Sequence, residues 1–168
     1  MAISLRFSER GASNSIRSLE FSLSPGYRIG AGAIAVALGF AAASAASATA
    51  WAFPILAALG ALYEERWSFD LRAGELRSRI GLVFIARKRR YAFASIAGVG
   101  VERFVKGALD QAAQVEPEKM PRGSEARLLV ELKDGSRLVV DALPYRDRER
   151  LTKAARRIAA LTGLALLD

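Results

Sequence analysis

The sequence predicts an α+β protein, in which an N-terminal transmembrane helical hairpin is followed by an antiparallel β-sheet or barrel closed by one C-terminal amphipathic helix. Three observations predict this class. Residues 29–63 contain no charged side chain, although a quarter of the chain is Asp, Glu, Lys or Arg. Several later segments alternate apolar and polar residues, and the period changes to 3.6 after Pro144. The expected division is an N-terminal segment over 1–28, the hairpin over 29–63 and one small domain over 64–168.

The N-terminal segment has the pattern of two β-strands. Apolar and polar residues alternate in Ile3–Phe7 and again in Leu19–Leu23. Gly11, Ser13 and Asn14 lie between them and favour a turn. Ser24-Pro25-Gly26 ends the pattern just before the apolar run. We therefore expect a β-hairpin that pairs with the C-terminal domain or with a partner, and a flexible tail is the alternative.

The uncharged run is too long for one membrane-spanning helix. A bilayer core about 30 Å thick is crossed by a helix of roughly 20 residues, whereas one helix over the whole run would be about 52 Å long. We therefore expect two short helices, Ile29–Ala46 and Thr49–Tyr63, joined by a minimal turn. A signal peptide cleaved within 45–48 is the alternative, but the preceding residues include two Glu and make a poor n-region.

Small and aromatic residues fit this hairpin. Gly39, Ala43 and Ser47 are spaced by four and share one helix face, where small side chains let two backbones approach closely in lipid. Gly60 is the matching small residue in the second helix. Aromatic side chains at both ends of the pair are expected to anchor it at the membrane interfaces. These anchors are Tyr27, Trp51, Tyr63 and Trp67.

The remaining 105 residues read as strands followed by one helix. The expected strands are 67–71, 75–80, 82–93, 99–105, 125–132 and 137–142. A long polar loop containing Pro117 and Pro121 is expected over 107–123. Asp134-Gly135 predicts a hairpin with a type I′ turn. In the helix after Pro144, an apolar stripe that includes Leu151 and Ile158 predicts the face that covers the sheet, and Gly163 is a suitable residue after its end.

Composition narrows the functions. Cys and His are absent, which removes disulfides, thiolate metal sites and the usual general base, and no carboxylate pair has a recognisable catalytic or metal-binding spacing. We expect no enzyme activity, no metal and no cofactor. The net charge is +8, and both flanks of the apolar run are positive. The positive-inside rule then places both termini in the cytoplasm and the helix connection outside.

Two groups of basic residues are the candidate binding sites for lipid or for a protein partner. Arg72, Arg77 and Arg79 lie across the first hairpin of the domain, and their spacing resembles the basic phosphoinositide-binding pattern that eukaryotic pleckstrin-homology domains carry there. Arg87-Lys88-Arg89-Arg90 is the densest charge run in the chain, and each such residue near a membrane adds about 1 kcal/mol of attraction to anionic lipid. A solvated basic face is the alternative. Glu64 and Glu65 follow the second helix and are expected to face water, with pairing to Arg66 or Arg28 as the alternative.

Several short motifs carry a resemblance to a known family. They are Trp67-Ser68-Phe69-Asp70, Gly74-Glu75-Leu76, Arg79-Ile80-Gly81-Leu82, Phe93-Ala94-Ser95-Ile96, Lys133-Asp134-Gly135 and Leu161-Thr162-Gly163-Leu164. With the order of elements, residues 29–168 resemble bacterial membrane proteins that have a two-helix transmembrane hairpin before a cytoplasmic pleckstrin-homology-like (PH-like) domain. The match to eukaryotic pleckstrin-homology domains is weaker. Those domains usually carry a Trp in the C-terminal helix, whereas residues 146–162 contain no aromatic side chain.

The resemblance implies a non-enzymatic membrane-anchored interaction or scaffold protein, an accessory or assembly subunit of an inner-membrane complex such as a bioenergetic one. The alternative is a stand-alone module that binds anionic lipid headgroups through its basic face. The expected partners are membrane lipids and other membrane-protein subunits, and neither nucleic acid nor a small-molecule substrate. The expected location is the bacterial inner membrane, as a multi-pass protein.

Overall fold

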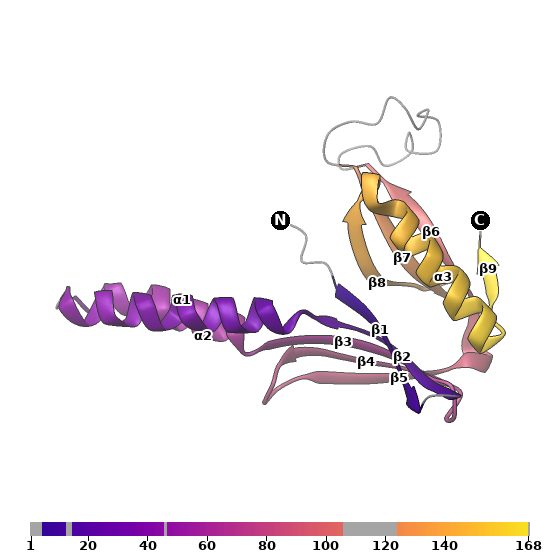
Figure 1. The fold of residues 1–168 in the computed structure, drawn as a ribbon, viewed down its shortest axis with the longest axis horizontal. Coiled ribbons are helices and arrows are strands. Elements are labelled where there is room, and N and C mark those ends of the chain that lie inside the picture. Colours follow the sequence, from indigo (N-terminus) through magenta and orange to yellow (C-terminus); the bar gives the residue numbers. More distant parts are fainter. Residues whose placement is uncertain (1–4, 13–14, 46, 106–123, 168) are drawn as a thin grey trace. The chain divides into compact units, whose positions relative to one another are not determined.

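The computed structural model describes residues 5–12, 15–45, 47–105 and 124–167 (Figure 1). They form two β-sheets and three α-helices, so the α+β class with antiparallel sheets is confirmed. The loop expected over 107–123 lies outside the described residues, as do Ile3, Ser13 and Asn14 of the N-terminal segment.

The first sheet contains five strands in the order β1-β2-β3-β4-β5. Their bounds are β1 Leu5–Ala12, β2 Ser15–Leu23, β3 Tyr63–Asp70, β4 Glu75–Leu82 and β5 Arg87–Ala92. The two N-terminal strands are present, and they pair within this chain: β2 is the neighbour of β3, and the Leu71 N–H donates to the Arg17 carbonyl at 3.1 Å.

The second sheet has the order β8-β7-β6-β9. Its strands are β6 Ile96–Phe104, β7 Glu125–Leu132, β8 Arg137–Pro144 and the short β9 Ala165–Leu167. β6, β7 and β8 pair antiparallel, whereas β9 runs parallel to β6. A Cβ at Gly98 or at Gly100 would lie 2.8 Å from atoms of Leu167, so glycine at both positions allows this close approach.

The expected single sheet or closed barrel over residues 64–168 is therefore wrong. β3, β4 and β5 form a sheet with the N-terminal strands, and the outer edge of β6 is covered by β9. The sequence pattern shows which face of each strand is apolar but not which strand edge meets which. Short 3-10 helices, η2 Phe93–Ser95 and η4 Tyr145–Asp147, lie at the two ends of the β6–β8 segment.

Helix α3, Arg148–Thr162, confirms the predicted C-terminal helix. Its buried residues are Leu151, Ala154, Ala155 and Ile158, and it packs on the second sheet. Gly163 ends the helix with φ 73°, a left-handed conformation that glycine adopts without strain. The expected apolar stripe and its end are both confirmed.

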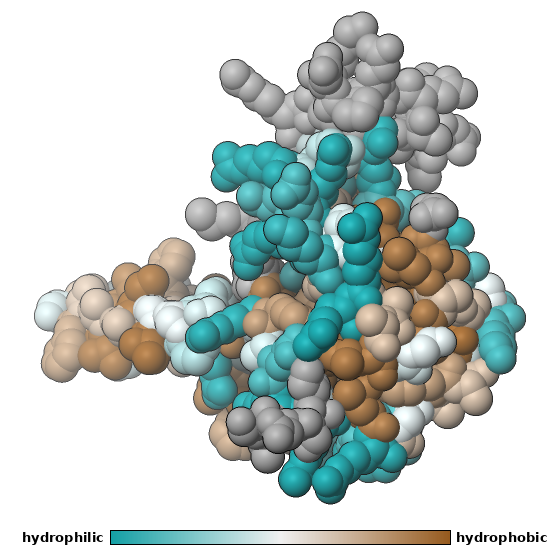
Figure 2. Space-filling view, turned by 45° about the vertical axis from the view of Figure 1, so that its right-hand side comes forward, coloured by the Kyte–Doolittle hydropathy of each residue, from teal (hydrophilic) through white to brown (hydrophobic). Residues whose placement is uncertain are grey.

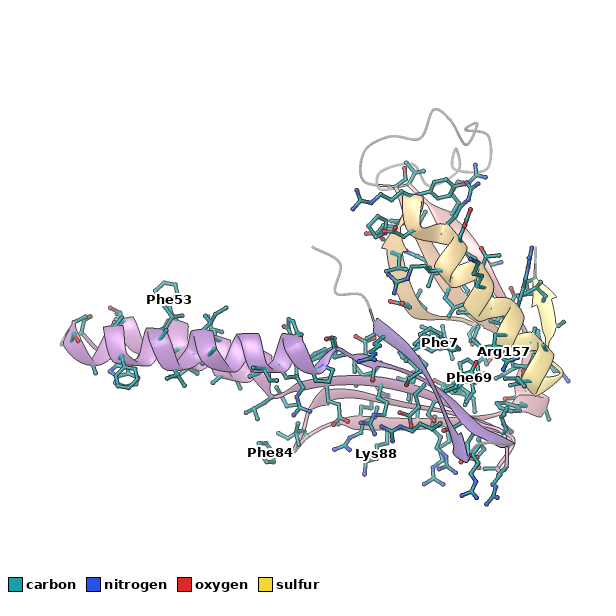
Figure 3. The ribbon with its side chains drawn as sticks, viewed as in Figure 1. Phe7, Phe53, Phe69, Phe84, Lys88 and Arg157 are labelled. Carbon is teal, nitrogen blue, oxygen red and sulfur yellow. The ribbon has the colours of Figure 1, made fainter. Side chains whose placement is uncertain are left out.

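The described chain divides into two compact units. Unit 1 comprises 1–21, 67–77 and 90–168, and unit 2 comprises 22–66 and 78–89. Within unit 1 the rings of Phe7 and Phe21 lie 5.0 Å apart between centroids, and Figure 3 shows Phe7 on its strand. An ion pair of 2.9 Å joins Arg157 of α3 to Glu9 of β1 at the surface. Leu19 and Phe21 of β2 are buried, so the N-terminal strands contribute to the core of unit 1.

Unit 2 contains the apolar helices. Helix α1 spans Pro25–Ser44; the Ser24 hydroxyl accepts a hydrogen bond from the Gly26 N–H at 3.2 Å, and proline occupies its first position. A 3-10 helix, η1 Ala48–Trp51, precedes α2, Ala52–Ala61. Helices α1 and α2 lie side by side (Figure 1).

The expected pair of transmembrane helices is only partly observed. Among the described residues, α1 alone is long and apolar enough to cross a membrane, and the apolar segment Ala48–Ala61 is shorter. Pro54 has no N–H to donate to the carbonyl four residues earlier. Regular α-helix therefore begins only at Ala52, and the preceding turn tightens into η1.

Candidate functional site

The surface of the helices is apolar and exposed. A space-filling view shows hydrophobic residues over this part of the chain (Figure 2), and Phe53 of α2 points away from both helices (Figure 3). The exposed large apolar residues here are Ile29, Ile34, Val36, Leu38, Phe40, Trp51, Phe53, Ile55, Leu56 and Leu59. The buried residues are Ala42 in α1 and Pro54 in α2. This surface requires a cover of lipid or of protein.

The small residues predicted to join the two helices do not lie in a tight contact. A Cβ added at Gly39 would meet nothing within 4 Å, and Ala43 and Ser47 are exposed. Gly60 faces the Tyr27 hydroxyl, which would lie 3.8 Å from an added Cβ. The buried small residue of α1 is Ala42, one position away. Spacing of four defines a face, but it does not say which of two neighbouring faces meets α2.

The four predicted aromatic anchors differ in their surroundings. Trp51 is 46% exposed at the end of η1. Tyr27 and Tyr63 are half-buried, and the Tyr63 hydroxyl donates to the Glu65 carboxylate at 3.5 Å. Trp67 is a core residue of unit 1, with 5% exposure, so its ring is not available to a lipid interface. Alternation in β3 could have indicated this, because Trp67 and the buried Phe69 share one strand face.

A network of polar contacts joins the end of α2 to the β-strands of unit 2. The Arg28 guanidinium donates to the Ala61 carbonyl at 3.3 Å, a favourable place for a cation because helix carbonyls end there. Arg79 lies 3.3 Å from Glu64, whose side chain is 13% exposed. Arg79 is therefore a structural residue of the sheet and not a free headgroup ligand.

The same network holds the turn between β4 and β5. Arg79 also donates to the Val83 carbonyl at 3.1 Å, and the Val83 N–H donates to the Leu62 carbonyl at 3.0 Å. Sequence reasoning missed Val83 and the pairing of Glu64 with Arg79, because both contacts join segments that are distant in sequence. Of the pairings considered for Glu64, that with Arg66 is present at 3.8 Å.

The β4–β5 turn is tight and apolar. The Ile85 N–H donates to the Leu82 carbonyl at 2.8 Å. Gly81 precedes it with φ 138°, and a Cβ there would lie only 2.9 Å from the Ile85 carbonyl oxygen. Phe84 and Ile85 are 80% and 81% exposed. The strand expected over 82–93 is therefore wrong in its first part, where the chain reverses before β5 begins at Arg87.

The basic run occupies β5, which is an edge strand of the first sheet. All four side chains are exposed. Among the described residues, no ion pair is found for Arg87 or Lys88, whereas Arg89 has an interaction with its surroundings. Arg90 is the next exposed residue of the strand and belongs to unit 1.

The other predicted basic group is already partly neutralised. Arg77 lies 3.1 Å from Glu75 and 3.4 Å from Asp70. Arg72 is exposed in the β3–β4 turn, where its N–H donates to the Asp70 carboxylate at 3.1 Å. Arg77 and Arg79 therefore have acidic partners within the chain, whereas Arg87 and Lys88 of β5 are exposed and have no ion pair among the described residues.

Known proteins add no identification. No protein-family model and no curated protein matches the chain. The PH-like resemblance therefore stays a prediction. In the part of the chain that the structure describes, no group of three or more Asp or Glu residues is placed to hold a metal ion. What the geometry offers is an uncovered apolar helical surface next to an apolar turn and a basic strand.

Proposed function

We propose that the protein is a non-enzymatic, membrane-anchored interaction or scaffold protein that acts as an accessory or assembly subunit of a membrane complex. The observation that carries the proposal is the surface of α1. Its 20 residues give a length of about 30 Å, the thickness of a bilayer core. Only 6% of its most apolar 18-residue stretch is buried, whereas the core helix of a water-soluble protein would be mostly buried.

Strand pairing supports a hairpin that returns to the side it left. β2 ends at Leu23 before α1, β3 begins at Tyr63 after α2, and the two strands are neighbours in one sheet. A sheet cannot be completed across a bilayer, so this pairing supports a topology in which both ends of the apolar run lie on the same side of the membrane. Both flanks are basic, which favours the cytoplasmic side.

The short second helix favours partner helices over lipid alone. Residues Ala48–Ala61 would span about 21 Å as an α-helix, which is less than the bilayer core. A short span is accommodated by local thinning of the bilayer or by association with other helices. The face of α1 that carries Gly39 and Ala43 is not occupied by α2, and small side chains there allow another helix to approach closely.

A second candidate function is binding of anionic lipid headgroups by the protein alone. The exposed Arg87 and Lys88 favour it, because they have no ion pair among the described residues. Positive charge on an edge strand also has a simpler role, since it discourages pairing with the edge of another sheet.

The test is extraction of the native membrane in mild detergent, followed by affinity purification and mass spectrometry of the proteins that accompany the chain. We expect a stoichiometric set of membrane proteins with the wild type. Ala43→Leu should lose them, because a large side chain prevents close helix approach. Ile34→Leu, about 180° away around the helix, should retain them. A chain that purifies with lipid alone would contradict the subunit role and favour the second candidate.

A further inference from the structure

The β4–β5 turn has side chains that a turn in water rarely has. Tight turns favour Gly, Asn, Asp, Ser and Pro, but Val83 and Phe84 occupy the central positions here. Phe84 and Ile85 are the two most exposed of the large apolar side chains in the part of the chain that the structure describes. In Figure 3 the Phe84 side chain points away from the strands. The turn is therefore shaped for an apolar medium.

The turn is held at the level where α2 ends. Val83 is bonded at both backbone groups: its N–H donates to the carbonyl of Leu62, the residue directly after α2, and its carbonyl accepts from Arg79. Arg79 is held in turn by Glu64. All of these residues belong to unit 2. We call these contacts among residues 62, 64, 79 and 83 the latch. If the helices enter a membrane, the latch places Phe84 at the surface of the leaflet at which α2 ends.

Charge next to the turn is complementary to that surface. Arg87 and Lys88 follow after one residue, Ala86, and are exposed without an ion pair among the described residues. Arg89 extends the same strand. An apolar tip followed by cations is the arrangement by which peripheral segments enter the boundary between headgroups and acyl chains, with the cations against anionic headgroups.

We propose that the β4–β5 turn is a further membrane anchor, in which Phe84 and Ile85 insert into the headgroup–acyl boundary while Arg87 and Lys88 contact anionic lipid headgroups. This inference rests on the proposed anchoring of the helices. The turn then fixes the sheet of unit 2 against the bilayer surface, so that the domain does not swing freely on its helices.

The sequence has no cysteine, so single-cysteine spin labels can be placed without other changes. The full chain is reconstituted into vesicles of phosphatidylcholine and phosphatidylglycerol with a label at Phe84→Cys, Phe53→Cys or Lys133→Cys. Lys133 is an exposed residue of the β7–β8 turn and serves as the matched aqueous control. Collision rates with oxygen, which dissolves in lipid, and with a water-soluble nickel complex give the depth of each label.

We expect the ratio of oxygen to nickel collisions at position 84 to be several-fold higher than at position 133 and lower than at position 53. Ile85→Cys, which leaves Phe84 in place, should give the same result. A label at 84 that is as accessible to nickel as the one at 133, while 53 lies in lipid, would overturn this inference alone. Aqueous labels at both 53 and 84 would overturn the anchoring itself. Protection of 84 from both reagents would indicate a protein cover and would also overturn the inference.

The headgroup contact has its own test. In vesicles of phosphatidylcholine alone, the label at 84 should lie closer to water than in vesicles that contain phosphatidylglycerol. Arg87→Gln with Lys88→Gln should remove this difference between the two lipid compositions. A depth that is independent of anionic lipid in the wild-type background would overturn the assignment of Arg87 and Lys88 to headgroups.

Discussion

Each of the two units contains a helix and a tight hairpin turn, but the large apolar side chains of the helix are buried in unit 1 and exposed in unit 2. In unit 1, α3 buries Leu151 and Ile158 against the sheet, and the β7–β8 turn presents polar side chains such as Asp134. In unit 2, α1 exposes residues such as Phe40, and the β4–β5 turn exposes Phe84. The same two structural elements thus differ in whether their large apolar side chains are buried or exposed.

The difference shows that apolar content alone does not define a core. Burying an Ile or Phe side chain contributes about 1.5–3 kcal/mol. Ile158 obtains this stabilisation from the protein itself, because it is fully buried. Ile34 and Phe40 are 57% and 74% exposed, and obtain it only from lipid or from a partner.

The largest effect is expected from the helix that packs within the chain. Ile158→Ala should lower the free energy of unfolding of unit 1 by about 2–5 kcal/mol, because it leaves a cavity at a fully buried site. Phe40→Ala should change it by no more than about 0.5 kcal/mol. Urea titration of the full chain in mild detergent, followed by tryptophan fluorescence, measures both. Equal costs would mean that α1 belongs to the same cooperative core.

Next in size is a charge in α1. Ile34→Asp should disfavour membrane insertion by about 3 kcal/mol, because the side chain lies near the helix centre. The variant is expected to move from the pellet to the supernatant when membranes are washed with alkaline carbonate, whereas Ile34→Leu stays in the pellet. Retention of the Asp variant in the pellet would show that α1 does not face the acyl chains.

A smaller effect separates the two turns. Gly81→Ala should cost about 1–3 kcal/mol, because a side chain at φ 138° is strained and its Cβ meets the Ile85 carbonyl. At Gly135, φ is 82° and an added Cβ would meet nothing within 4 Å, so Gly135→Ala should cost only about 1–2 kcal/mol.

Trypsin provides the measurement for this pair, since the basic run follows the first turn directly. Release of the β4–β5 turn in Gly81→Ala should accelerate cleavage after Arg87. The Gly135 variant is the control and should leave that rate unchanged. Similar cleavage rates in the wild type and in Gly81→Ala would show that the turn is not held by its close backbone contact.

The smallest effect concerns pH. The Ser136 hydroxyl donates to the Asp134 carboxylate at 2.6 Å and the Ser136 N–H at 2.8 Å, which lowers the pKa of Asp134. A lowered folded-state pKa contributes stability above the unfolded-state value, about 3.9, and that stability is lost as pH falls through the lower folded-state value. Asp134→Asn should therefore have a lower melting temperature than the wild type at neutral pH, and this difference should shrink as the pH falls below about 4. A constant difference in melting temperature down to acid pH would refute this role.

Local patterns predicted much of the secondary structure. Alternation located β3, β4, β6, β7 and β8 to within a few residues, and the 3.6 period located α3 and its end at Gly163. The hairpin at Asp134-Gly135 is present, but the expected type I′ turn with these two residues at its centre is wrong. The Gly135 N–H donates to the Leu132 carbonyl, so the central residues are Lys133 and Asp134, and Gly135 is the last residue of the turn. Ser24 and Pro25, which predict a break in the strand pattern, are also the N-cap and the first residue of α1.

Long-range features were not accessible from these patterns. The partition of strands between two sheets depends on edge pairing, and the three-residue β9 is too short to show alternation. The face of α1 that carries the buried Ala42 is one residue from the predicted one. In the candidate site, the exposed basic residues were identified. The latch on Val83 was not, since it joins residues 62, 64, 79 and 83 through contacts without a sequence signature.

The adjacency of β2 and β3 imposes an order in time. During synthesis, β1 and β2 emerge first, but the strand that completes their sheet follows only after the whole apolar run. Until then the free edge of β2 is unpaired and open to wrong pairing. Because the helices connect two neighbouring strands, the sheet can close only after the whole apolar run has been synthesised, and any slow step within that run would prolong the time for which the edge of β2 stays unpaired.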